Sequence, residues 1–239
     1  MTGTADVVVV GGGVNGVSIA YALAARGVAR VVLCEQAALA NGASGRSSAL
    51  VRMHYTNEWD ARLAFASFPV FKHWPEIMGG PAVFTHTGFV NVVAPAYADA
   101  LRKNVRMLRG IGVNTTAMTP GEHHDLQPFA NVDDLGAAAW EPDSGYADPA
   151  GTVEGFRRRA SELGAQILQW TPVRKILRSE SRVIGVETSG AASTPAPSWS
   201  PPAPGHRVSA ARSGSSSRRG PKASTRCRSS DRRRSPSLT

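Results

Sequence analysis

Three glycines near the start of the chain have the spacing of a turn that binds a dinucleotide. Gly11, Gly13 and Gly16 form a G-x-G-x-x-G pattern directly after an apolar run, with Val14 and Asn15 between the last two. The first glycine permits a tight turn, the second lets backbone N–H groups approach a pyrophosphate, and the third lets a helix pack closely on a strand. The N-terminus of that helix also favours negative charge. The pattern therefore predicts a pyrophosphate site.

A carboxylate follows these glycines at the distance expected in a dinucleotide-binding unit. Glu35 lies 24 residues after Gly11, at the end of a second apolar run. A carboxylate there accepts hydrogen bonds from ribose hydroxyls and repels a 2′-phosphate, which is evidence against NADP. A glycine turn alone also serves ordinary strand-to-helix packing, and Glu35 alone fits a solvated strand end. The strand, helix, second strand and acid together favour the nucleotide interpretation.

A short polar segment follows within ten residues of this acid. It contains Ser44, Gly45, Arg46, Ser47 and Ser48. Backbone amides and hydroxyls of this kind complete a phosphate cradle, and an arginine offsets the charge of the phosphates. The alternative for such a composition is a flexible surface loop.

One βαβ unit is predicted to position these groups. The sequence predicts a strand over 6–10, a helix over 14–26 and a strand over 30–34. A second helix is predicted over 57–78, with a break or kink at Pro69. The predicted buried side of that helix consists of Trp59, Leu63, Ala66, Phe71 and Trp74.

A mixed region follows, and the α/β pattern then returns. The pattern is β-like over 82–93 and helical over 97–110. After Asp148-Pro149 a helix through Leu163 is predicted, and strands are expected around 167–169, 173–177 and 183–188. The fold class is therefore α/β: a Rossmann-like nucleotide-binding βαβ layer with part of a mixed α+β substrate domain and a disordered C-terminal tail. The predicted domains are a first part of the nucleotide-binding domain (1–80), a partial substrate domain (81–147), a second nucleotide-binding part (148–188) and the tail (189–239).

The positive charge of the chain is confined to this tail. The formal net charge is +9, but residues 1–189 are neutral, and residues 190–239 hold ten Lys and Arg against Asp231 alone. A segment dominated by Ser, Arg, Pro, Ala and Gly buries too little apolar surface to offset its chain entropy, so we expect disorder. Ten cations favour salt-sensitive phosphate binding. Trp199 is the only aromatic residue there and lies away from the arginine clusters, so a nucleic-acid partner is not expected.

The sequence gives no sign of a disulfide framework, a membrane span or a metal site. Cys34 lies in a predicted buried strand, far from Cys227, which fits a reducing cytoplasm better than a disulfide framework. The run 7–10 is much shorter than the ~20 residues of a membrane span, and no basic stretch precedes it. We expect a cytoplasmic protein without membrane insertion. His123 and His124 are adjacent and point to different faces of a short helix, so no metal site is expected.

The order of the motifs resembles a known family. After the glycine turn and Glu35 come Ala43-Ser-Gly-Arg-Ser-Ser48, Leu50-Val-Arg52 and Ser144-Gly-Tyr-Ala-Asp-Pro149. Over residues 5 to 188 this order is similar to that of the FAD-dependent amine and amino-acid oxidoreductases of the D-amino-acid oxidase group, with sarcosine oxidase and glycine oxidase as the nearest types. A generic NAD-binding domain would not show it. The resemblance implies an FAD cofactor and a small amine or amino-acid substrate.

The resemblance also implies roles for single residues. The glycine turn and the acid hold ADP in the family, and the Ser-Gly-Arg-Ser loop lies against the pyrophosphate and the flavin. Val173 matches a strand valine whose backbone contacts the adenine, with an ordinary buried valine as the alternative. Arg52 matches an arginine that helps bind the substrate carboxylate, with an ordinary surface arginine as the alternative. His54, close to Arg52, is expected to be a packed or exposed histidine, with an approach to the flavin as the alternative. The implied reaction oxidises a C–H bond next to an amine by hydride transfer to the flavin.

The resemblance stops after Val186-Glu-Thr188. Relatives continue with further strands, whereas residues 197–205 here read Pro-Ser-Trp-Ser-Pro-Pro-Ala-Pro-Gly. If the codons end in G, a shifted frame reads Val-Val-Val-Ala-Ala-Gly, the pattern of the family strand that revisits the nucleotide. We hypothesise that the tail is an out-of-frame reading of a GC-rich gene, which sequencing of the coding DNA tests.

Three functions are therefore considered from the sequence. The first is a working FAD-dependent oxidoreductase, and the second is a truncated, inactive relative that binds FAD weakly or not at all. Because the strands that normally close the site are missing from the pattern, we expect weak or no retention of flavin. A nucleic-acid binder acting through the basic tail ranks third. Substrate identity, the electron acceptor and the oligomeric state stay open.

Overall fold

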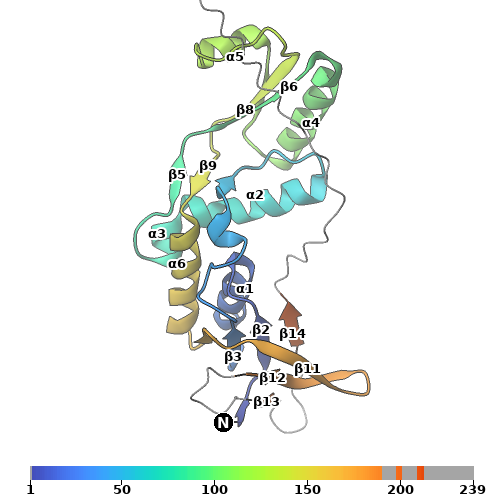
Figure 1. Ribbon diagram of the computed structural model, residues 1–239. Helices are drawn as coiled ribbons and strands as arrows, with labels where there is room; N and C mark the ends of the chain where they lie inside the picture. Colours follow the sequence, from blue (N-terminus) through green and yellow to red (C-terminus); the bar gives the residue numbers. More distant parts are fainter. Residues whose placement is uncertain (1, 190–197, 201–208, 213–239) are drawn as a thin grey trace, which may run out of the picture.

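The computed structural model describes residues 2–189, 198–200 and 209–212. Figure 1 shows an elongated arrangement in which the first strands lie at one end and the segment 89–141 lies at the other. Helix α2 (Glu58–Lys72) lies between these ends. Pro197 and residues 201–208, on which much of the reading-frame hypothesis depends, are outside the described residues.

A parallel four-stranded sheet forms the nucleotide-binding end of the molecule. Its order is β10 (Gln166–Leu168), β3 (Val31–Cys34), β2 (Val7–Val10) and β14 (Ser209–Arg212). The runs in β2 and β3 are apolar and mostly β-branched, which suits strands buried on both faces. Helix α1 (Val14–Ala25) connects these two strands. The predicted βαβ unit is therefore confirmed.

Two helices cover one face of this sheet. Helix α6 (Pro149–Glu162) packs along α1, and Figure 1 shows the two close together. Asp148 caps α6, because its Oδ1 accepts a hydrogen bond from the Ala150 N–H at 3.0 Å. The hydrophobic core between this sheet and the helices consists of Val9, Val17, Ala20, Ala24, Val31, Leu33, Trp74, Met78, Val153, Phe156, Ala160 and Ala165.

A second sheet covers the other face. Its order is β1 (Thr2–Thr4), β13 (Ser198–Ser200), β12 (Arg182–Thr188) and β11 (Val173–Ser179). Strands β11, β12 and β13 pair antiparallel in turn, and β13 pairs parallel with β1. The residues buried between the two sheets are Ala5, Val8, Val32, Cys34 and Val186. Along β2 and β3 they alternate with the residues that face the helices.

Two short strands lie inside the segment that the sequence predicts to be disordered. Strand β13 pairs with β1 and β12, and β14 pairs with β2 from Val7 to Val10, so the structure differs from the expectation at these residues. The backbone N–H and C=O groups of a strand edge pair with a further strand through its main chain. Composition therefore does not reveal such pairing. The rest of 189–239 lies outside the described residues.

The helix predicted over 57–78 is two helices. Helix α2 contains Pro69 in its interior, and the break falls at His73, directly before α3 (Trp74–Met78). Pro75 occupies the first turn of α3, where its missing N–H costs nothing. The break predicted at Pro69 is therefore wrong in position.

The buried side of α2 also differs from the prediction. Trp59 and Leu63 are 74% and 69% exposed, and Ala66 is exposed as well, so their predicted burial is wrong. Helix α2 instead buries Ala61 and Phe68. These pack with Met53, Leu108 and Val113. Trp74 is buried and Phe71 is half-buried, as expected.

A mixed α+β region forms the far end. An antiparallel sheet has the order β6 (Phe89–Val93), β8 (Ala137–Glu141) and β7 (Thr116–Met118). Helix α4 (Ala98–Ile111) and the shorter helix α5 (Pro120–Leu126) pack on this sheet. Tyr97 and the two residues before it form the short helix η2 (Pro95–Tyr97) ahead of α4.

A small antiparallel sheet joins this region to the nucleotide-binding end. Its order is β4 (Leu50–Val51), β9 (Gly145–Ala147) and β5 (Phe84–His86), and α6 follows β9 directly. The domain boundaries at residues 80, 147 and 188 stay predictions. Within the described part of the chain, none of the helices has the length and apolarity required to cross a membrane.

Candidate functional site

The glycine turn between β2 and α1 is closed by the carboxylate of Glu35. Gly11 has φ +108°, a conformation that favours glycine. Glu35 Oε2 accepts a hydrogen bond from the Gly12 N–H at 2.6 Å, and Oε1 accepts one from the Ala37 N–H at 2.8 Å. A carboxylate has about four lone-pair sites, so both oxygens retain acceptor capacity for ribose hydroxyls. Gly16, the third glycine of the pattern, is buried in α1 as expected for close helix packing.

The predicted serine-rich loop lies over the N-terminus of α1. Ser44 Oγ accepts a hydrogen bond from the Val14 N–H at 2.9 Å. A Cβ on Gly13 would lie 3.0 Å from this hydroxyl, so the glycine keeps the approach open. Ser44 begins the short helix η1 (Ser44–Arg46), and a Cβ on Gly45 would overlap the Ala40 carbonyl oxygen. The loop therefore has a defined conformation at the point where the helix presents its N–H groups.

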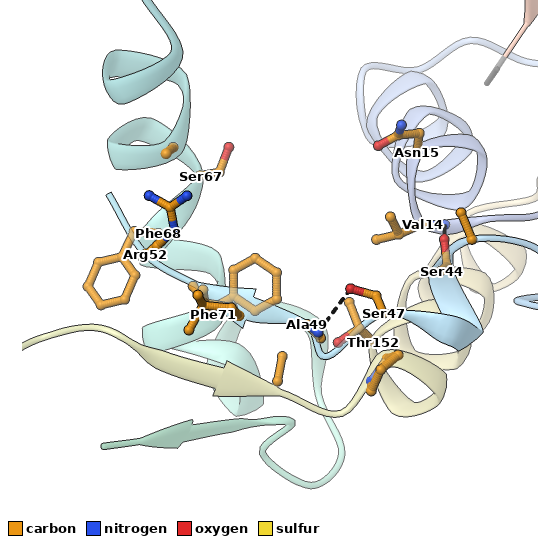
Figure 2. Close-up of a pocket in the computed structure, with 16 residues that line it drawn as sticks. Val14, Asn15, Ser44, Ser47, Ala49, Arg52, Ser67, Phe68, Phe71 and Thr152 are labelled. Carbon is orange, nitrogen blue, oxygen red and sulfur yellow. Dashed lines mark hydrogen bonds between the residues drawn. The ribbon is translucent and has the colours of Figure 1, made fainter. Parts of the chain in front are cut away.

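A cavity of about 420 Å³ runs from this helix terminus toward the mixed region. Figure 2 shows Val14, Asn15, Ser44 and Ser47 on one side of it and Arg52 with the α2 phenylalanines on the other. Its volume falls in the roughly 300–1,000 Å³ range of small-molecule and cofactor sites. The lining residues are Val14, Asn15, Ala43, Ser44, Ser47, Ala49, Leu50, Val51, Arg52, Ala64, Ser67, Phe68, Phe71, Ala147, Pro149 and Thr152.

Arg52 lines the cavity on the side opposite Val14 and Ser44 (Figure 2). Its Nη1 donates to the carbonyl oxygen of His54. The guanidinium carbon lies 4.7 Å from the ring centroid of Tyr55 and 5.3 Å from that of Phe89. The group is therefore held by two aromatic faces, which is a favourable cation–π arrangement. Among the described residues one donor of the five has an acceptor, so the others are available to a ligand.

Val173 lies beside a second cavity of about 370 Å³, next to the glycine turn. Val10 lines it together with Val173, Arg174, Lys175 and Ile176. The segment before Val173 lies beside Glu35, because the Thr171 N–H donates to the Glu35 carbonyl oxygen at 2.7 Å. The cavity borders the residue that directly precedes Gly11, so its position fits the adenine contact expected of Val173.

The structure brings most of the predicted site residues together, but not all of them. Arg46 and Ser48 are exposed and are not among the residues that line the main cavity. The roles of all the predicted site residues stay predictions. Ser47 lines the cavity, and its Oγ accepts a hydrogen bond from the Ala49 N–H at 2.9 Å. Gly12 and Thr152 were not singled out from the sequence. The run of three glycines was a usable signal for Gly12, whereas nothing local marks Thr152.

The three histidines named from the sequence have different environments. His54 is 5% exposed and packed, so it does not face solvent. His123 is buried and His124 is exposed, as expected for adjacent positions on α5. Within the residues that the structure describes, no group of three His, Cys, Asp or Glu side chains has the geometry of a metal site. Cys34 is buried in β3, and burial raises the pKa of its thiol to about 11.

The fold and the site define a class: a Rossmann-type nucleotide-binding fold whose main cavity extends from the pyrophosphate turn into a mixed α+β region. Comparison with known proteins gives the family. The sequence model of the FAD dependent oxidoreductase (DAO) family matches residues 6–197, and the chain belongs to this family. Its members depend on FAD, as the sequence predicted.

Several curated proteins and solved structures are similar to the chain. The chain is 29% identical over 193 residues to the sarcosine oxidase subunit beta of Arthrobacter sp, which covers 77% of this chain and 47% of that protein. It is 30% identical over 207 residues to the mitochondrial sarcosine dehydrogenase of Homo sapiens, covering 80% and 22%. The crystal structure of L-proline dehydrogenase from P. horikoshii aligns with a TM-score of 0.75 at 27% identity, covering 88% and 53%. The chain thus spans about half, or less, of the length of these relatives.

The residues present fit FAD. The pyrophosphate needs N–H donors and no side chain at the turn. The first turn of α1 has N–H groups without a partner inside the helix, and Gly12 and Gly13 keep the turn free of side chains. Ribose hydroxyls need an acceptor, which Glu35 provides. Ser44 and Ser47 contribute hydroxyls where the main cavity begins.

Proposed function

We propose that this chain carries the FAD-binding part and one carboxylate-binding residue of an oxidoreductase that acts on N-methylated amino acids. The observation that carries the proposal is the cavity that begins at the N-terminus of α1 and ends at Arg52. It connects a nucleotide-binding turn at one end with a cation at the other. A flavin and a small anionic substrate need these two ends.

The residues of the chain have binding and positioning roles in this proposal. The α1 terminus and Ser44 would hold the pyrophosphate, Glu35 the adenosine ribose, and the strand end at Val173 the adenine. The apolar wall formed by Phe68 and Phe71 would exclude water from the flavin ring. When bound, FAD supplies the hydride-accepting chemistry, so the protein needs no nucleophile or metal of its own.

The substrate class is inferred from Arg52 and from the names of relatives. A guanidinium stacked on aromatic rings and open toward a cavity suits a carboxylate. Relatives are named for sarcosine, for dimethylglycine and for 4-methylaminobutanoate. These compounds share a methylated amine and a carboxylate, which is the chemistry that we propose for the substrate here.

Titration with FAD, followed by anaerobic addition of substrate, tests the proposal. Because weak retention is expected, FAD is added to the purified protein, and binding is followed by the change in flavin fluorescence. Sarcosine should then bleach the visible absorption of the bound flavin, and dimethylamine, which lacks the carboxylate, should do so much less. The Arg52→Gln variant should keep its FAD affinity and lose this preference. Absence of FAD binding at any concentration would show that the proposal is wrong.

A second candidate is a member of the family without turnover. One relative, 27% identical over 185 residues, is named a pyruvate dehydrogenase phosphatase regulatory subunit. Its name describes regulation rather than oxidation. Saturable FAD binding without bleaching by any amine or amino acid would favour this candidate over the first.

A further inference from the structure

A cluster of buried polar side chains lies next to the segment that carries Arg52. It consists of His54, Asn91, Asn104, Glu141 and Ser144, which we call the His54 cluster. Glu141 is fully buried and His54 is 5% exposed. Burial of a carboxylate is unfavourable unless hydrogen bonds or a partner compensate for the lost water. The cluster therefore needs a reason other than filling space, and none of the binding roles above uses it.

Glu141 fixes the backbone of the segment that carries Arg52. Its Oε2 accepts hydrogen bonds from the Met53 N–H at 3.1 Å and from the Ser144 hydroxyl at 2.9 Å. Among the described residues, its Oε1 has no hydrogen-bond partner and lies 3.7 Å from His54 Nδ1, which also lacks one. That separation exceeds the usual hydrogen-bond range of about 2.7–3.2 Å by less than an ångström. A movement of less than an ångström would therefore bring these two atoms into hydrogen-bond distance.

The other ring nitrogen of His54 is held from two different elements. Nε2 lies 3.2 Å from Nδ2 of Asn91 in β6 and 3.1 Å from Nδ2 of Asn104 in α4. An amide nitrogen donates and does not accept, so Nε2 is the acceptor in both contacts. With these amide orientations, a neutral His54 ring carries its proton on Nδ1, the nitrogen that lies 3.7 Å from Glu141 Oε1. The imidazole is consequently clamped between β6, α4 and β8.

The clamped residue is also the one that holds the guanidinium. Arg52 Nη1 donates to the His54 carbonyl oxygen, and the guanidinium lies over Phe89. The Phe89 ring also lies near the His54 ring, with centroids 6.4 Å apart. A displacement of His54 would therefore move both the acceptor and one of the aromatic faces that orient Arg52.

We propose that His54 and Glu141 are positioning residues, which hold Arg52 toward the cavity so that it can bind a substrate carboxylate. This role rests on the proposed function, because it requires that Arg52 binds a carboxylate. Neither side chain is among the residues that line the main cavity, so no contact of the pair with substrate is proposed. Its effect passes through the backbone of residues 52–54 and through Phe89.

The ring proton of His54 provides a test that needs neither FAD nor substrate. The protein is labelled with ¹⁵N-histidine, and the His54 signals are identified by their loss in His54→Gln. We expect the spectrum of the Nδ1–H tautomer and a shift of the Nδ1 signal in Glu141→Gln. His124→Gln, which changes an exposed histidine on α5, serves as the control and should leave the His54 signals unchanged. An Nε2–H tautomer, or His54 signals that do not respond to Glu141→Gln, would overturn the proposal.

Substrate kinetics and binding separate positioning from a purely structural role. In the FAD-loaded protein, His54→Leu should raise the KM for sarcosine about tenfold while the FAD dissociation constant stays within about twofold of the unaltered protein. His54→Gln retains an acceptor for the asparagines and a donor for Glu141, so it should restore most of the sarcosine affinity. An unchanged KM in His54→Leu, or equal losses of FAD and sarcosine binding, would refute the role.

Failure of the proposed function gives a different pattern. If the unaltered protein binds no sarcosine, the proposed function and the role in carboxylate binding both fall, whatever the tautomer of His54. If the unaltered protein binds sarcosine and His54→Leu binds it equally well, only the positioning role falls.

Discussion

Gly12 occupies a position where any side chain would collide with the group that closes the nucleotide turn. A Cβ there would overlap Leu39 Cδ2 and lie 2.9 Å from Glu35 Cβ. Glu35 is not free to move, since its carboxylate also accepts the Ala37 N–H. We expect Gly12→Ala to weaken FAD binding at least about tenfold, or ~1.4 kcal/mol. Gly42→Ala is the control, because a Cβ there meets no atom of the described residues within 4 Å. Flavin fluorescence titrations compare the two, and equal affinities would contradict the prediction.

Cys34 makes the stability of the protein dependent on alkaline pH. Burial raises the pKa of its thiol from 9.0 to about 11, so the unfolded chain loses this proton at lower pH than the folded chain. The contribution to stability is therefore complete below pH 9 and is lost as the pH rises toward 11, by up to about 3 kcal/mol.

Urea unfolding at pH 8, 9, 10 and 11 measures this effect. Cys227→Ser is the parent, so that Cys34 is the only thiol, and the double variant with Cys34→Ala is compared with it. The difference in unfolding free energy between the two should change with pH in the stated direction. Parallel pH profiles would mean that the thiol does not contribute.

At the scale of elements, α6 meets Trp74 at a residue without a side chain. A Cβ on Gly155 would overlap the buried indole ring. A Cβ on Gly110 in α4 meets no atom within 4 Å in the part of the chain that the structure describes. Alanine is favoured over glycine in a helix by about 1 kcal/mol, so Gly110→Ala should raise the unfolding free energy by up to that amount. Gly155→Ala should lower it by about 1–3 kcal/mol through overpacking. Denaturant titrations measure both, and shifts of the same sign would count against the packing described here.

The elements that the sequence predicts correctly have partners close to them in the chain. The run Val7–Val10, the glycine turn and the run Val31–Cys34 specify a βαβ unit because each part packs on the next. Helix α2 has apolar residues on more than one side, and the sequence pattern selects Trp59 and Leu63. The structure selects Ala61 and Phe68, because Leu108 and Val113 of a distant segment pack there. A local pattern does not contain that information.

The same limit applies to the candidate site. Ser44, Glu35 and Arg52 belong to motifs that recur in a fixed order, so the sequence predicts a role for each of them. The His54 cluster was not, because its contacts join residues 50 and 88 positions apart. No spacing rule connects such residues, and only the folded chain brings them together.

Across the whole molecule, the excess positive charge and the residues that line the predicted cofactor site lie in different parts of the sequence. Both cavities are lined by residues of the neutral part, 1–189, whereas residues 213–239 carry eight Lys and Arg and one Asp. Removal of residues 213–239 lowers the formal net charge from +9 to +2 and leaves β14 in place. We therefore expect FAD affinity to stay within about twofold, because no residue that lines either cavity is removed.

Unlike FAD affinity, DNA binding should depend on residues 213–239. At 20 mM salt the unaltered chain should retain duplex DNA without sequence preference, and the affinity should fall steeply as salt is added, because released counterions drive such binding. Removal of residues 213–239 should abolish it, and replacing the eight Lys and Arg by Ser should do the same at constant length. Fluorescence anisotropy with a labelled duplex at 20 and 150 mM salt measures both variants. Tight binding that persists at 150 mM salt would instead make nucleic acid a specific partner, and FAD affinity that falls with the charge would link the two sites.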